Sequence, residues 1–169
     1  LVTSVIENTL NTEINKRYAI SDLNIVNDNS IVALKKYGND FISITQLYSQ
    51  DLTEDEIVVF ERMLRTEDQE DAAYLNESAT AYVAVADKLT DIKIPSDLAF
   101  IHLDIINSYS VVSSALENMS LALDDPIRGL NGFSVHTAVT EAQVGFFKEI
   151  KNYFVKNGII FGDLIRKYT

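Results

Sequence analysis

The chain has 169 residues, and 47% of them are apolar, which fits one domain with a buried core and excludes a disordered tail. It carries 25 acidic and 14 basic residues, and the net charge of −11 disfavours nucleic acid as a partner, because phosphate backbones would be repelled. Cysteine is absent, which excludes disulfides, thiolate metal sites and a cysteine nucleophile.

Residues 1–20 predict a modest amphipathic helix, because apolar side chains such as Val5, Leu10 and Ile14 recur among polar ones. The chain begins with Leu1 rather than with methionine, so we expect upstream residues, and this helix would then be a stalk that follows a membrane anchor. Within the chain, no apolar run approaches the roughly 20 residues needed to span a bilayer. Contact with a membrane is therefore expected only through a segment that is absent here.

The next part of the chain predicts a short extended segment followed by a helix. Residues 22–26 alternate between polar and apolar side chains, and the cluster from Asn27 to Ser30 can cap a helix. From Ile31 to about Gln50, apolar residues recur at steps of three or four, which predicts one apolar helix face.

Two more helices are predicted around a strongly acidic stretch. Thr53 and Glu56 have the spacing of a capping box, which predicts a helix that begins at Thr53. Residues 66–71 then break or bend this helix, and a further helix is predicted to about Leu89.

The longest helical pattern extends from Ser96 to Asn157. The sequence Asp124-Asp-Pro126, followed by a turn over residues 129–132, divides it into two long helices. Asn157-Gly158 is a typical helix C-terminus, and residues 159–161 beyond it are short and extended.

These elements predict an all-α, up-and-down helical bundle of four to five helices, in a single domain over residues 1–169. The two short extended segments allow a minimal two-stranded pairing of residues 23–26 with residues 159–161.

The two histidines are the first candidates for chemistry. His102 lies on or beside the apolar stripe of its helix, where a hydrogen-bonded structural histidine is the favoured interpretation. The alternative is a pocket between helices, formed by His102, Tyr109 and His136, that binds a small molecule or an ion. No Glu precedes either histidine by three residues, so a di-iron pattern is absent, and we predict neither a metal site nor a cofactor.

The acidic stretch from residue 51 to residue 77 is the second candidate. Four acids at its centre, Glu67, Asp68, Glu70 and Asp71, could form a docking face for a basic protein partner, and the acidic stretch could also be a loose divalent-cation site. The simpler interpretation is a solvated helix face whose carboxylates favour first helical turns. Phosphate loops, nucleophile elbows and zinc-binding His-Glu-x-x-His motifs are absent from the sequence, so we predict no enzyme and no catalytic residues.

A pattern of short stretches covers most of the chain beyond Ser21. The stretches are Ser21-Asp-Leu-Asn-Ile-Val-Asn-Asp-Asn-Ser30, Ala33-Leu34, Tyr37-Gly38-Asn39, Ile94-Pro95, Leu98-Ala99, His102-Leu103, Asn107, Asp125-Pro126 and Asn157-Gly158-Ile159-x-Phe161. This pattern resembles a family of uncharacterised helical proteins encoded by uncultured bacteria with small genomes. The resemblance implies an extracytoplasmic domain behind a signal or a membrane anchor, sometimes encoded near pilus or secretion genes. It supplies no catalytic residues.

Two hypotheses follow. The favoured one is a non-enzymatic interaction or structural module of a cell-envelope, secretion or pilus-like apparatus, which contacts a protein partner through exposed helix faces. The alternative is a sensor bundle that binds a small molecule or an ion between helices near His102.

Overall fold

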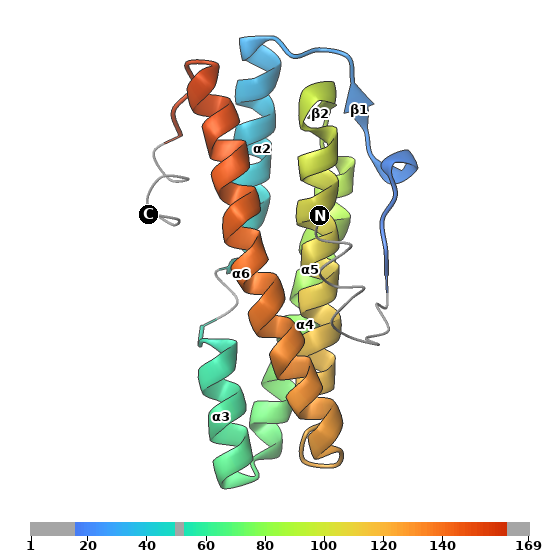
Figure 1. Ribbon diagram of the computed structural model, residues 1–169, viewed down its shortest axis with the longest axis vertical. Helices are drawn as coiled ribbons and strands as arrows, with labels where there is room; N and C mark the ends of the chain where they lie inside the picture. Colours follow the sequence, from blue (N-terminus) through green and yellow to red (C-terminus); the bar gives the residue numbers. More distant parts are fainter. Residues whose placement is uncertain (1–15, 50–52, 162–169) are drawn as a thin grey trace.

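The computed structural model describes residues 16–49 and 53–161, and within them the predicted all-α bundle is confirmed (Figure 1). Its five α-helices are α2 (Ile31–Ser49), α3 (Glu56–Thr66), α4 (Gln69–Asp91), α5 (Ala99–Ser120) and α6 (Pro126–Lys156). Two 3-10 turns, η1 (Ile20–Asp22) and η2 (Ser96–Leu98), and two short strands, β1 (Ile25–Val26) and β2 (Ile94–Pro95), complete the described elements.

The helices α4, α5 and α6 run up and down beside one another along the length of the molecule (Figure 1). The fourth position of the bundle is divided, since α2 occupies one half of it and α3 occupies the other. Two apolar clusters fill the core accordingly. The α2 half includes Leu34, Tyr37, Phe41, Leu89, Ile105 and Phe154, and the α3 half includes Val59, Phe60, Met63, Leu75, Val112 and Met119.

The N-terminal helix was predicted over residues 1–20, of which residues 1–15 lie outside the described part of the chain. Over residues 16–19, which the structure describes, the prediction is wrong. Residues 16–19 are not helical, and η1 follows them. The cause lies in Asn107 of α5, whose side-chain oxygen accepts from the Tyr18 amide at 2.8 Å while its amide group donates to the Tyr18 carbonyl at 3.1 Å. These backbone groups pair across the fold rather than within a helix.

The predicted strand pairing has the wrong partner. β1 pairs in parallel with β2, with Ile25 opposite Ile94 and Val26 opposite Pro95. Residues 159–161 instead close the end of α6, where the Ile159 amide donates to the Phe154 carbonyl at 2.9 Å. The segment then packs against α2, because the ring of Phe161 occupies the place that a side chain at Gly38 would take.

Two helix boundaries differ from the sequence prediction. Asp55, not Thr53, caps α3, and its carboxylate accepts from the amides of Ile57 at 2.9 Å and Val58 at 3.2 Å. Residues 129–132 are helical rather than a turn, since α6 begins at Pro126. Gly132 serves close helix packing, because a Cβ there would come within 2.6 Å of the Ala115 carbonyl oxygen of α5.

Among the described residues, no helix has both the length and the apolar character that crossing a lipid bilayer requires.

Candidate functional site

His102 has a complete set of hydrogen-bond partners inside the core. Its side chain is fully buried, its Nδ1 lies 2.8 Å from the Tyr37 hydroxyl of α2, and its Nε2 lies 3.1 Å from the Leu89 carbonyl of α4. The Leu89 carbonyl belongs to the last turn of α4, where no helical amide follows to donate to it. His102 therefore fastens α2 and the end of α4 to α5.

The partners of His102 define its protonation state. A carbonyl oxygen can only accept, so Nε2 carries the hydrogen and Nδ1 accepts from the Tyr37 hydroxyl. Burial lowers the pKa of His102 from 6.5 to about 4, against the opposing effect of the Leu89 bond. The ring is neutral at pH 7, and both nitrogens are already used within the fold.

The structure does not bring the three predicted pocket residues together. The Phe41 ring lies 6.2 Å from both His102 and Phe147, which places these three side chains at one level of the bundle. Phe147 follows His136 by eleven residues of α6, so His136 lies about 16 Å further along the helix. His102 therefore belongs to the α2 half of the core and His136 to the α3 half.

His136 differs from His102 in its bonding. Its residue is 3% exposed, and neither ring nitrogen has a hydrogen-bond partner among the described residues. Burial lowers the pKa of His136, while the carboxylates of Glu56 and Asp55 oppose that shift. A buried donor without a partner destabilises a fold by about 1–3 kcal/mol, so His136 would lower the stability of this protein if its nitrogens stayed unpaired.

Polar side chains of α3 and α4 lie near His136, because the Glu56 carboxylate acts on its pKa and the Tyr82 hydroxyl bonds that carboxylate. The Tyr82 hydroxyl of α4 donates to Glu56 of α3 at 3.1 Å, and the Tyr82 ring lies 5.9 Å from the Tyr109 ring of α5. We call His136, Glu56 and Tyr82 the His136 layer. Of the three predicted pocket residues it contains His136, whereas Tyr109 packs in the α2 half of the core.

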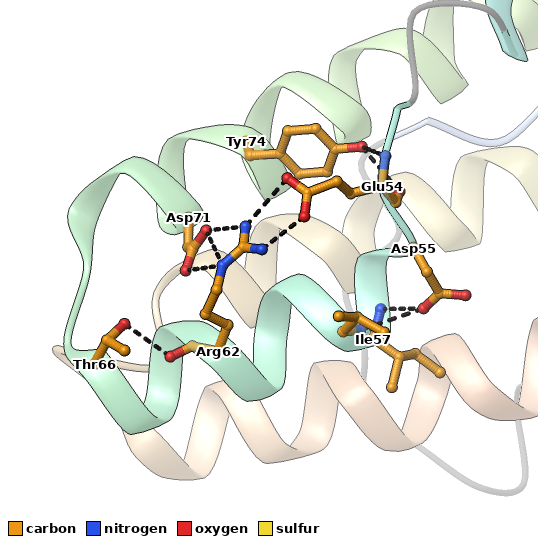
Figure 2. Close-up of polar contacts among 8 residues, drawn as sticks. Glu54, Asp55, Ile57, Arg62, Thr66, Asp71 and Tyr74 are labelled. Atoms are coloured by element: carbon orange, nitrogen blue, oxygen red, sulfur yellow. Dashed lines mark hydrogen bonds and ion pairs between the residues drawn. The ribbon is translucent and has the colours of Figure 1, made fainter.

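The acidic stretch is organised around Arg62. The Arg62 guanidinium donates to both oxygens of Asp71 at 2.6–3.0 Å and to both oxygens of Glu54 at 2.6–3.2 Å (Figure 2). The Tyr74 hydroxyl lies 2.9 Å from both the amide nitrogen and the carbonyl oxygen of Glu54. These contacts fix α3 and its entry against α4.

Asp71 does not belong to an exposed docking face. It is only 5% exposed, and hydrogen bonds from Arg62 hold the pKa of its carboxyl below the ordinary value. Its carboxylate has a structural role in holding Arg62. The prediction that Asp71 is part of an exposed docking face is therefore wrong, because its ion pair with Arg62 buries the side chain.

The other three predicted acids, Glu67, Asp68 and Glu70, are exposed at the turn between α3 and α4. Glu67 has a φ of 54°, which ends α3, and the Asp68 carboxylate caps α4 by accepting from the Glu70 amide at 2.9 Å. We call these three residues the acidic end.

Exposed apolar side chains lie beside the acidic end. The rings of Phe60 in α3 and Phe133 in α6 stack at 5.6 Å. Leu64 and Leu130 each lie one turn from this pair, and the two helices are antiparallel, so both turns lead toward the same end of the bundle. Leu64 is 42% exposed, Leu130 59% and Ile127 83%. We call these three residues the apolar strip.

The described residues offer no group of three His, Asp or Glu side chains that could hold a metal ion. Sequence reasoning missed the Tyr37 bond to His102, the Tyr82 bond to Glu56 and the bonds of Arg62 to Glu54 and Asp71, which we call the Arg62 clamp. In the sequence, such a bond is indicated only by a polar side chain on an otherwise apolar helix face. That pattern does not show which residue the side chain bonds to.

Comparison with known protein families, with characterised proteins and with solved structures finds no match to this chain.

Proposed function

We propose that this protein is a non-enzymatic helical module that binds another protein through the acidic end and the apolar strip. The partner presents an apolar stripe flanked by Lys or Arg, as a basic amphipathic helix does. Acidic residues outnumber Arg65 and Arg128 at this end of the bundle, so opposite charge would steer such a partner and fix its orientation.

The observation that carries the proposal is the juxtaposition of Leu64, Leu130 and Ile127 with Glu67, Asp68 and Glu70. Large apolar side chains that remain exposed beside a charged rim are typical of protein interaction sites. The Arg62 clamp supports the surface from within by fixing α3 on α4. Because this surface is already ordered, little conformational entropy is lost when a partner binds.

The location that we propose is outside the cytoplasm, at a cell envelope or in a secretion or pilus-like apparatus. This part of the proposal rests on the sequence resemblance. An upstream anchor would hold the module at the membrane and leave the acidic end free for a partner.

The alternative of a small-molecule or ion sensor at His102 has less support. Tyr37 and Leu89 already bond both ring nitrogens, so a ligand would have to displace a buried contact. The partner-binding module needs no such rearrangement.

The proposal is tested by affinity capture from native cells after crosslinking, with fractionation of the envelope and mass spectrometry. The test variant combines Glu67→Gln, Asp68→Asn and Glu70→Gln, because Asn retains the cap at residue 68. We expect the full-length protein in the envelope fraction, together with a partner that has a basic amphipathic segment and is lost from the triple variant.

A matched control combines Asp91→Asn, Glu141→Gln and Glu149→Gln, which changes the net charge equally at exposed positions on α4 and α6. Equal loss of the partner from both variants would mean that overall charge, not the acidic end, governs binding. Recovery of the protein alone and free of the membrane would contradict both the partner and the location.

A further inference from the structure

We propose that the His136 layer is an internal binding site for a small neutral hydroxyl ligand, whose oxygen bonds to the His136 ring and to Glu56 or Tyr82. The ligand is a water molecule or a small alcohol of similar size, and both offer the same O–H chemistry. The site is separate from the surface proposed to bind a protein partner.

His136 has two ring nitrogens that can each form a hydrogen bond. A neutral imidazole has one N–H donor and one acceptor nitrogen, and its burial, which lowers the pKa, keeps the ring neutral at pH 7. Neither nitrogen has a protein partner among residues 16–49 and 53–161. Native interiors rarely leave such atoms unpaired, and a bound oxygen is the usual remedy.

Two other polar groups, Glu56 and Tyr82, lie near His136. Glu56 precedes Phe60 by one helical turn, and His136 follows Phe133 by one turn. Since the two phenyl rings stack at 5.6 Å between antiparallel helices, Glu56 and His136 lie on the same side of this stack. The Tyr82 hydroxyl of α4 also lies beside Glu56, because it donates to the Glu56 carboxylate at 3.1 Å.

The negative charge near His136 selects the kind of ligand. The carboxylates of Glu56 and Asp55 are close enough to raise the pKa of His136 against the effect of burial, so an anion at this place would be repelled. A hydroxyl suits both sides, because it can accept from the ring N–H and donate to the Glu56 carboxylate. A water molecule needs two to four polar partners, and the layer provides them.

The direct test is a high-resolution crystal structure of the wild-type protein, grown without small alcohols or polyols. We expect an oxygen at about 2.7–3.2 Å from one ring nitrogen of His136 and within the same distance of Glu56 or Tyr82. A single rounded peak identifies water, and elongated density identifies a small organic hydroxyl retained from the cells. A ring with no such oxygen, or with a protein atom on each nitrogen, overturns the proposal.

A second measurement counts long-lived internal water in solution by oxygen-17 relaxation dispersion. His136→Phe keeps a ring of similar size and removes both nitrogens, so we expect it to contain at least one long-lived water fewer than the wild type. An unchanged count in a folded variant overturns the proposal for water. If His136→Phe does not fold, the wild-type crystal structure decides alone.

Discussion

Tyr37 and His102 join α2 to α5 through a buried hydrogen bond of 2.8 Å, although 65 positions separate them in the sequence. The same imidazole bonds the Leu89 carbonyl at the end of α4, so three helices meet at one ring. This relationship makes His102 a structural residue, and it leads to two predictions.

The stability of the protein should fall with acidification through His102. Its pKa is about 4 when folded and 6.5 unfolded, so the unfolded chain binds the proton more readily as the pH falls from 6.5 to 4. The stabilisation is complete above pH 6.5, and about 2 kcal/mol of it should be lost at pH 5. Urea unfolding of the wild type and of His102→Gln from pH 7.5 to 4.5 isolates the contribution of His102 to the pH dependence of stability, because Gln does not titrate. Parallel pH profiles would contradict the prediction.

Tyr37→Phe should destabilise the fold by about 1–2 kcal/mol, because it leaves the acceptor nitrogen of His102 buried without a donor. Tyr153→Phe is the matched control, since its hydroxyl bonds the exposed residue Asp97 at 2.9 Å. Chemical denaturation measures both variants. A loss in Tyr153→Phe as large as that in Tyr37→Phe would show that burial of the bond does not matter.

The two carboxylates that hold Arg62 should contribute unequally. Both carboxylates bind Arg62 through both oxygens, but Asp71→Asn should lower the melting temperature more than Glu54→Gln, because Asp71 is buried and Glu54 is exposed. Glu67→Gln is the control and should leave the melting temperature nearly unchanged, since its side chain is exposed. Equal shifts for Asp71→Asn and Glu67→Gln would contradict a structural role for Asp71.

Substitution by alanine at two glycines of α6 should change the stability of the protein in opposite directions. Gly132→Ala should cost about 1–3 kcal/mol, because the new Cβ would lie 2.6 Å from the Ala115 carbonyl oxygen. Gly145→Ala should gain about 0.5–1 kcal/mol, because nothing lies within 4 Å of its Cβ position and alanine favours a helix. Thermal unfolding measures both. A gain at Gly132 would mean that α5 and α6 do not approach closely.

The helices could be predicted because their apolar stripes are long and regular, as in α2, α5 and α6. Boundaries that depend on tertiary contacts could not. Gly129 and Gly132 have the composition of a turn, yet they lie inside α6, where the small size of Gly132 lets α5 approach and that of Gly129 lets Ala122, in the turn after α5, approach. The strand partner of residues 25–26 was also unpredictable, because a two-residue strand has no pattern that specifies its neighbour.

The candidate site was predicted in part. The sequence indicated that His102 is a hydrogen-bonded core histidine, and the structure confirms this and names Tyr37 and Leu89 as its partners. The sequence could not separate His102 from His136, because the register of α5 against α6 depends on side-chain packing. It also could not show that Asp71 turns inward, since Arg62 lies nine positions away on another helix.

The central claim is that the apolar strip beside the acidic end contacts a protein partner. The most direct test places a photo-crosslinking amino acid at Leu130, or at Val155 near the opposite end of α6, in the full-length protein in native cells. The account predicts one discrete crosslinked partner with a basic amphipathic segment from position 130, and none from position 155. Crosslinking of that partner from position 155 alone would contradict it.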